Sequence, residues 1–162
     1  MMKRLFVLLL CLATYKPNLA QLAVITNAVP PFKILLTNGS YFGYKDLEIN
    51  KSLMLIYFSP DCDHCRDFIH TLRAKMGYLI GIQIIMVSYF PLKSLQQFNK
   101  DYKLGEFSNI KIGTEGNSFL IPGYFKIGKF PFTVLYNKVG KRVITFREVP
   151  SWEVLSDFIR KL

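Results

Sequence analysis

The 162-residue sequence contains few residues that bind metals through sulfur or imidazole, with three cysteines and two histidines. A closed zinc site needs four ligands, and the only candidates beside Cys62 and Cys65 are His64 and His70. The spacing Cys-x-x-Cys would suit half of such a site, so zinc binding remains an alternative interpretation. We expect no bound metal, because the other two ligands would both have to be these histidines.

The N-terminal part of the sequence lacks an apolar run long enough to span a bilayer. The first four residues end in the basic pair Lys3 and Arg4. A short apolar block follows at residues 5–13, and the small residue Ala20 comes after it. This order is typical of a secretory signal peptide over residues 1–20, whereas a spanning helix needs about 20 apolar residues. We therefore predict an exported, periplasmic protein. A lipoprotein site at Cys11 is disfavoured, because Leu10 stands where such sites prefer a small residue.

Acidic residues are scarce, with 11 against 21 lysines and arginines. Without residues 1–20, 18 of the basic and all 11 acidic residues remain, which gives a net charge of +7 and leaves two cysteines. The lysines are scattered from Lys33 to Lys161, and this argues against nucleic acid as a partner. The charge is compatible with peripheral contact with an anionic membrane surface. Two cysteines suit one redox couple in an oxidising compartment.

Both remaining cysteines lie where a strand is predicted to give way to a helix. Residues 53–58 form an apolar run of the kind found in a strand covered on both faces. The apolar residues that follow recur at helical spacing up to Gly77: Cys65, Phe68, Ile69, Leu72 and Met76. A helix N-terminus favours a thiolate, so Cys62 is predicted to be the exposed, more acidic nucleophile and Cys65 the resolving thiol.

The other elements follow from periodicity and from turn residues. Residues 21–30 are predicted to be a flexible lead-in, and residues 31–162 the folded domain. Strands are predicted at 32–37 and 41–44 as a hairpin, and at 82–88, 130–136 and 142–147. Helices are predicted from Pro91 to about Gly105 and from the cap Ser151 onward, with an inner face of Val154, Leu155, Phe158, Ile159 and Leu162. Residues 103–128 are predicted to be the least regular, with a short extended piece at 110–112 and a brief helix capped by Asn117.

A Cys-x-x-Cys motif between a buried strand and a helix resembles the thioredoxin-like superfamily. The hairpin resembles the TlpA/ResA branch of redoxins (AhpC/TSA-type), and the block that begins at Pro131 resembles the end of such domains. The resemblance implies an α/β fold with a central mixed sheet flanked by helices and an N-terminal β-hairpin extension. It also implies a redox pair, Cys62 and Cys65, and no cofactor. Near Cys62 it implies a cis bond between Phe130 and Pro131, whose backbone pairs with a partner peptide.

The sequence departs from this family around the cysteines. The buried acid that thioredoxins place six residues before the first cysteine is Ile56 here, and the usual tryptophan is Asp61. Between the cysteines, Asp63 and His64 replace Gly-Pro, and His64 stands where the periplasmic oxidants have histidine. A cationic His64 would stabilise a thiolate while Asp61 and Asp63 would oppose it, so these residues tune the redox pair without fixing its direction.

We interpret the protein as a monomeric thiol–disulfide oxidoreductase that acts on protein thiols and disulfides through Cys62 and Cys65. The hairpin favours the reducing direction, and His64 favours the oxidising one. Two alternatives are a module of the same fold that binds copper through the thiolates and a chaperone without redox turnover. An inert disulfide would close too short a loop to stabilise much. A peroxide site is disfavoured because Leu55 stands where its motif needs proline.

Overall fold

The computed structural model describes residues 28–162, so the predicted signal peptide, residues 1–20, lies outside the described residues. Most of the predicted lead-in, residues 21–27, also lies outside them. Its described end packs on the rest of the chain: Val29 contacts the core and Pro30 is buried. The Tyr124 hydroxyl donates a hydrogen bond to the Ala28 carbonyl at 3.2 Å.

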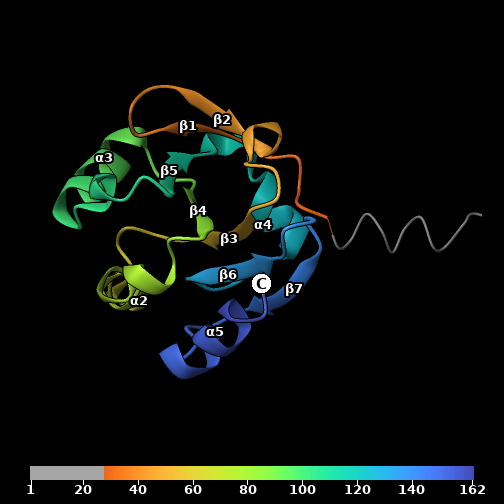
Figure 1. Ribbon diagram of the computed structural model, residues 1–162. Coiled ribbons are helices and arrows are strands. Elements are labelled where there is room, and N and C mark those ends of the chain that lie inside the picture. Colours follow the sequence, from red (N-terminus) through yellow and green to blue (C-terminus); the bar gives the residue numbers. More distant parts are fainter. Residues whose placement is uncertain (1–27) are drawn as a thin grey trace, which may run out of the picture.

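Seven strands form one mixed sheet in the order β2-β1-β5-β4-β3-β6-β7 (Figure 1). The strands are β1 (Lys33–Leu36), β2 (Tyr41–Gly43), β3 (Ser52–Tyr57), β4 (Ile82–Ser88), β5 (Ile110–Thr114), β6 (Phe132–Tyr136) and β7 (Arg142–Phe146). β3 and β5 run parallel to β4, which lies between them, and β6 runs antiparallel to β3. The hairpin β1–β2 extends one edge by pairing with β5. The predicted mixed sheet with an N-terminal hairpin is confirmed.

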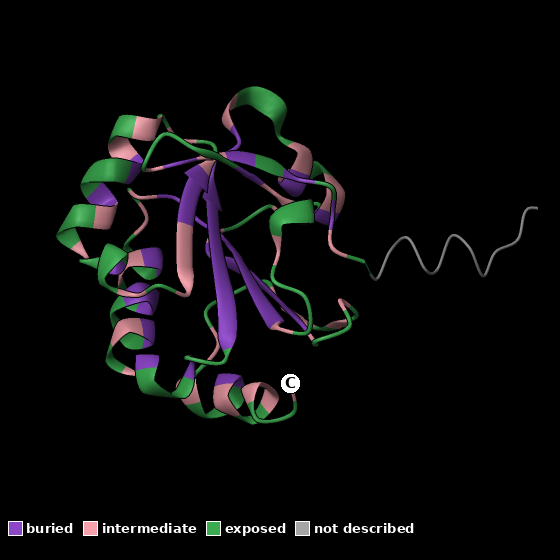
Figure 2. Cartoon of the chain, turned by 45° about the horizontal axis from the view of Figure 1, so that its top comes forward, coloured by how far each residue is buried: buried purple, intermediate pink, exposed green. Residues whose placement is uncertain are grey.

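In residues 28–162, four α-helices cover the two faces of this sheet: α2 (Asp63–Ala74), α3 (Leu92–Asp101), α4 (Leu120–Phe125) and α5 (Trp152–Ile159). Side chains of α2, α3 and α5 pack in one cluster with β3, while α4 packs with the hairpin on the opposite face. The central strands are buried and the outer helix surfaces are exposed (Figure 2). Within residues 28–162, none of the helices combines the length and the apolar character needed to cross a bilayer.

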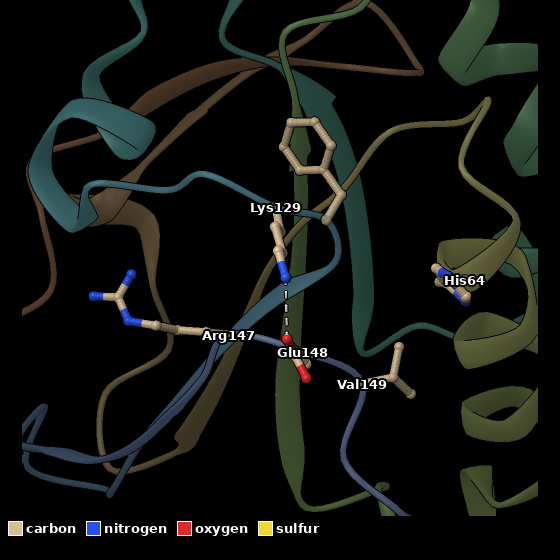
Figure 3. A pocket seen from close by; sticks show the side chains of 6 residues that line it. His64, Lys129, Arg147, Glu148 and Val149 are labelled. Atoms are coloured by element: carbon tan, nitrogen blue, oxygen red, sulfur yellow. Dashed lines mark hydrogen bonds and ion pairs between the residues drawn. The ribbon is translucent and has the colours of Figure 1, made fainter.

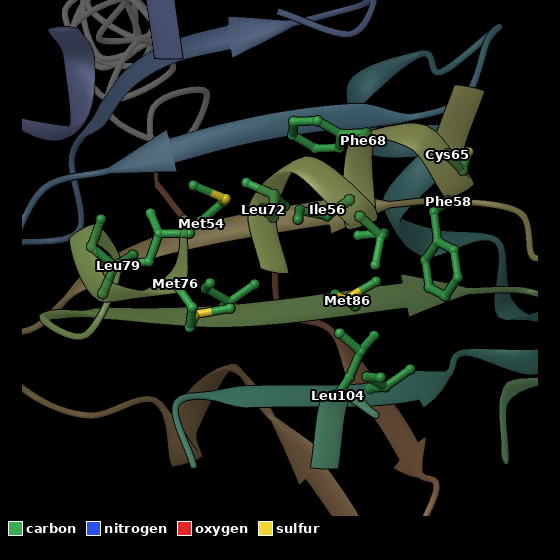
Figure 4. Close-up of a cluster of buried hydrophobic side chains, with 14 of the residues drawn as sticks. Met54, Ile56, Phe58, Cys65, Phe68, Leu72, Met76, Leu79, Met86 and Leu104 are labelled. Carbon is green, nitrogen blue, oxygen red and sulfur yellow. The ribbon is translucent and has the colours of Figure 1, made fainter. Parts of the chain in front are cut away.

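Successive residues of β3 point to the two sides of the sheet in turn, and all six are buried. Those on the α2 side, with the residue just after the strand, are Met54, Ile56 and Phe58. Those on the α4 side are Leu53, Leu55 and Tyr57. Figure 4 shows the α2 side, where Cys65 lies at the end of the cluster near Phe58. The strand is thus held on both faces, and this fixes the point at which the cysteine loop leaves the sheet.

Ser151 caps α5 as predicted, because its hydroxyl accepts a hydrogen bond from the Val154 N–H at 3.4 Å. Two other local predictions are wrong in detail. Residues 103–128 are more regular than expected, because β5 is an inner strand of the sheet. Val154 is 46% exposed, since the buried stripe of α5 runs through Trp152 and Leu155 at helical spacing and Val154 falls beside it.

The brief helix predicted after Asn117 exists, but it begins later. Asn117 lies in a 3-10 turn, η5 (Gly116–Ser118), and α4 starts at Leu120. Between them, Phe119 adopts a left-handed conformation with φ of 45°, which interrupts the helix before α4 can begin. The short α4 therefore starts without a side-chain cap.

Candidate active site

Cys62 is the residue that precedes α2, where the chain has left β3. Its N–H donates to the Ser59 carbonyl at 3.2 Å, and its carbonyl accepts the first helical hydrogen bonds from the N–H groups of Cys65 and Arg66, both at 3.1 Å. Both cysteines are free thiols. The predicted position of the pair at a helix N-terminus is confirmed.

The two thiols differ in their surroundings. Cys62 is half-buried, whereas Cys65 is 0% exposed and belongs to the cluster between β3 and α2. Burial raises the pKa of the Cys65 thiol well above its usual value, and its hydrogen bond with Cys62 adds to this effect. Smaller contributions from Ser59 and Arg66 act in the opposite direction. The predicted order of exposure is confirmed, and a partner can reach Cys62 first.

The loop before β6 brings Phe130 and Pro131 to Cys62. The Phe130–Pro131 peptide bond is cis, and Pro131 is buried. The Cys62 thiol donates to the Phe130 carbonyl across 3.7 Å from sulfur to oxygen. Pairing of Phe132 with Tyr57 places this loop at the end of β3 that leads to the cysteines. The predicted cis bond near Cys62 is confirmed.

Asp61, Asp63 and His64, the residues predicted to tune the redox pair, are all exposed. The Arg66 side chain forms an ion pair with the Asp63 carboxylate and donates to the Pro60 carbonyl at 3.1 Å. The positive charge of Arg66 offsets the negative charge of Asp63. The surroundings of Cys62 therefore carry less negative charge than the two aspartates alone would give them. Sequence reasoning missed Arg66, although its spacing of three residues from Asp63 on a helix is a usable signal.

A pocket of about 630 Å³ opens beside the cis peptide bond (Figure 3). Its lining consists of His64, Lys129, Phe130, Arg147, Glu148 and Val149. His64 projects from the start of α2 on one side, and the segment that follows β7 forms the other side. The Lys129 ammonium pairs with the Glu148 carboxylate at 3.3 Å, and Arg147 is a second basic residue in the lining. The pocket therefore offers space next to the cysteines for a partner side chain.

Phe130 also belongs to an aromatic surface that sequence reasoning missed. The Tyr89 ring lies 6.3 Å from that of Phe130 and 5.7 Å from that of Phe119, and the Tyr57 ring lies 5.8 Å from that of Phe130. Phe119 is 49% exposed and has a left-handed backbone, a conformation that is uncommon for a bulky residue. The four rings come from separate loops and strands, so the sequence carries no local signal for them.

Glu115 is the one charged side chain that is buried among residues 28–162. Its Oε1 accepts a hydrogen bond from the Tyr57 hydroxyl at 2.6 Å, and its Oε2 accepts from the Ser118 hydroxyl at 3.1 Å and the Ile121 N–H at 3.2 Å. Burial, with the hydrogen bond to Glu115, raises the pKa of Tyr57, which therefore remains a donor. These bonds join the end of β5 to β3 and α4, and they support the aromatic surface from beneath.

Within residues 28–162, no acidic side chain takes the place of the buried acid of thioredoxins in the cluster that holds Cys65. Ile56 is 0% exposed and lies in the same cluster as Cys65, whereas Glu115 bonds to Tyr57, which points to the other side of the sheet. In the described part of the chain, no three acidic, histidine or cysteine side chains are grouped so as to hold a metal ion. The chemistry that the arrangement supports directly is that of the two thiols.

No protein-family model matches the chain, and no curated protein matches it by sequence. By structure it is similar to a secreted disulfide oxidoreductase of Mycobacterium tuberculosis homologous to E. coli DsbE, with 18% identity and a TM-score of 0.68 over 82% of this chain and 96% of that one. The thioredoxin domain of a Bacteroides vulgatus thiol-disulfide oxidoreductase is 16% identical, with a TM-score of 0.68 over 84% of this chain and 95% of that one.

A further similar structure is an exposed lipoprotein thioredoxin of Streptococcus pneumoniae, 16% identical with a TM-score of 0.63 over 82% of this chain and 99% of that one. In all three cases almost the whole of the other chain is covered, while the identities are too low to transfer more than the architecture. The chain therefore has the thioredoxin-like fold.

Proposed function

We propose that the protein is an exported thiol–disulfide oxidoreductase that acts on disulfides of other proteins. The observation that carries the proposal is the arrangement at the start of α2: an accessible Cys62 over a buried Cys65, with the Phe130 carbonyl 3.7 Å from the Cys62 sulfur. A helix N-terminus stabilises the thiolate that attacks the partner. The buried second thiol is placed to attack the mixed disulfide that results.

The reaction proceeds by two exchanges. The Cys62 thiolate attacks one sulfur of the partner disulfide, a new S–S bond forms, and the other partner sulfur leaves as a thiolate that takes up a proton. Cys65 then loses its proton and attacks the Cys62 sulfur, which releases the second partner sulfur as a thiol. Two electrons have moved to the partner, and Cys62 and Cys65 are left as a disulfide. The reverse sequence, with a dithiol donor, restores the pair.

The backbone beside Pro131 and the neighbouring pocket suit an extended peptide. The Phe130 carbonyl faces Cys62 and can also accept a hydrogen bond from a partner N–H. The pocket beside it, with His64 and Lys129 in its lining, takes a side chain that flanks the partner cysteine. Phe130 and Pro131 are thus the proposed substrate-binding residues.

We assign the reducing direction and a periplasmic location. The β1–β2 hairpin supports reduction, because it resembles the TlpA/ResA branch, and the order of residues 1–20 supports export. Among the similar structures, one is described as secreted and another as exposed. The reduction potential tests the direction: a value near about −270 mV fits a reductase, and one near about −120 mV would reverse the assignment.

Trapping the mixed disulfide tests the roles of the cysteines. In a Cys65→Ser variant the second exchange is blocked, so a partner with a disulfide should remain attached to Cys62 and be identifiable by mass spectrometry. A Cys62→Ser variant is the matched control and should trap nothing. Trapping by Cys62→Ser, or faster alkylation of Cys65 than of Cys62 in the reduced protein, would refute the assignment.

A further inference from the structure

Four chain segments meet at the end of the sheet that is opposite to Cys62. Ser52, the first residue of β3, pairs with Ile82, the first of β4, and the next residue of β3 pairs with Tyr136, the last of β6. The segments beside these strand ends are residues 47–51, 75–81 and 137–141. The Ser52 hydroxyl donates to the Leu162 carbonyl at 3.3 Å, and this adds residues 160–162. We call these four segments the basic pole.

The basic pole carries the most exposed apolar side chains of the described residues. Ile49 is 90% exposed, Val139 82%, Tyr78 72% and Ile80 71%, and every other large hydrophobic side chain in residues 28–162 is less exposed. A single exposed hydrophobic residue is ordinary on a protein surface. Four at one end, each at the tip of a loop or turn, form a site that can bury them in another apolar phase.

These loops are held in place by a buried amide. Gln83 accepts from the Glu48 N–H at 2.9 Å and donates to the carbonyls of Glu48 and Lys51 at 3.1 and 3.0 Å. Ile49 lies inside this clamp, so its exposed side chain is presented by an ordered loop. The apolar tips therefore do not have to be organised when a partner binds.

The same segments are strongly basic. They contain six lysines and arginines, namely Lys51, Lys75, Lys138, Lys141, Arg160 and Lys161, and one acid, Glu48. Glu48 pairs with Lys51 at 3.0 Å, and Arg160 pairs with Asp157 on α5. Glu153 at the start of α5 lies near Lys75. Lys138, Lys141 and Lys161 then remain to give this end of the molecule its positive charge.

We infer that the basic pole docks the protein onto an anionic lipid surface. Such a surface is bound by apolar side chains that enter the interface, by an exposed tyrosine and by surrounding lysines. Each lysine near the surface strengthens binding about fivefold. A purely ionic partner would leave the four apolar tips without a role. β3 separates the pole from the cysteines by about 20 Å, so the redox site would face the aqueous side of a docked molecule.

The chain carries a built-in reporter of this contact. Trp152 is its single tryptophan, and the Trp152 ring lies 5.7 Å from that of Tyr78 at the basic pole. The Lys75 ammonium lies 5.9 Å from the same ring. Burial of Tyr78 in a lipid interface would therefore change the environment of Trp152 and shift its emission to shorter wavelength.

The experiment uses the full chain and vesicles of phosphatidylcholine with or without phosphatidylglycerol. The wild-type protein should sediment with the anionic vesicles, its tryptophan emission should shift, and brominated lipid should quench it. Substitution of the tips, Ile49→Ser with Ile80→Ser and Val139→Ser, should weaken binding by about tenfold or more. Charge reversal by Lys138→Glu with Lys141→Glu should weaken it by about 25-fold or more at low salt.

Matched controls lie on the hairpin and in the 3-10 turn that follows it: Tyr41→Ser with Tyr44→Ser for the tips, and Lys33→Glu with Lys45→Glu for the charges. They should bind as the wild type does, and because every protein compared contains residues 1–27, that segment cannot produce the difference. Equal losses in the pole and control variants, or vesicle binding without a change in tryptophan emission, would overturn the proposal. So would binding to an acidic polymer together with no binding to anionic vesicles. All these substitutions leave the cysteines intact, so thiol–disulfide exchange is scored separately.

Discussion

Burial of Cys65 decides when the second exchange can occur. Its thiol lies 0% exposed between β3 and α2, and Ile56 stands in that cluster where thioredoxins have an acid. A buried thiolate is unfavourable, and among residues 28–162 no carboxylate belongs to the cluster around Cys65 to take the proton. The release step should therefore wait on proton removal by water or hydroxide.

We expect the release step to depend steeply on pH. Since the pKa of Cys65 is raised by burial, its thiolate fraction should grow about tenfold for each pH unit through the neutral range, without levelling off near the usual cysteine value of about 8.5. A preformed mixed disulfide on Cys62, followed by stopped flow from pH 6 to 9, measures this rate directly. A rate that levels off below pH 8 would contradict the assignment.

Ile56→Asp supplies a carboxylate on the side of β3 that holds Cys65, and it should flatten this pH dependence. Leu55→Asp is the matched control, because it introduces the same buried charge on the α4 side. Both substitutions should lower stability by several kcal/mol, and the comparison applies to the folded fraction of each. An unchanged slope in the Ile56 variant would show that the proton leaves by a route that does not pass position 56.

At the scale of elements, the hairpin β1–β2 depends on a close approach between β1 and β5. A Cβ atom at Gly113 would lie 2.8 Å from the Leu35 carbonyl oxygen and 3.0 Å from the Ile34 side chain. The first of these neighbours is backbone and cannot turn away. Only glycine lets the hairpin join the sheet at this distance.

Gly113→Ala should therefore destabilise the protein by about 1–3 kcal/mol, through displacement of β1 from β5. Urea denaturation measures the change, with Gly77→Ala as the control. A Cβ at Gly77 meets nothing within 4 Å, so that variant should stay within about 0.5 kcal/mol of the wild type. Equal stability of the two variants would mean that β1 can move away from β5 without lowering the free energy of unfolding.

Elements with a strong local pattern could be predicted from the sequence, and those that depend on distant partners could not. β3 and β4 are continuous apolar runs, and α5 has both a cap and a periodic face. β5 contains Lys111 and Gly113, which weaken a strand signal, and it is a strand because β1 and β4 pair with it on both sides.

The same distinction holds for the site. Cys62, Cys65 and Pro131 belong to local motifs, so their positions and the cis bond were predictable. Glu115 and Tyr57 are 58 residues apart, and neither is marked by a motif. Their hydrogen bond exists because β3 and β5, both parallel to β4, finish at the same end of the sheet, which only the assembled topology shows.

At the scale of the whole molecule, the redox site and the basic pole lie at opposite ends of β3. Effects at such distances are usually independent. The tip variant Ile49→Ser with Ile80→Ser and Val139→Ser should thus reduce a soluble disulfide peptide at the wild-type rate. Its rate should fall about tenfold when the same peptide is anchored to anionic vesicles, because docking no longer concentrates the protein there. Loss of the soluble activity would show that the two ends are coupled.

The contact between the Cys62 thiol and the Phe130 carbonyl makes one proton responsible for two events. While the thiol holds its proton, that proton takes up one of the two acceptor positions of the carbonyl that a partner strand would use. When the proton leaves, the sulfur becomes a nucleophile and the carbonyl regains that acceptor position at the same moment. Loss of this one proton therefore activates the sulfur and frees acceptor capacity for the partner backbone together.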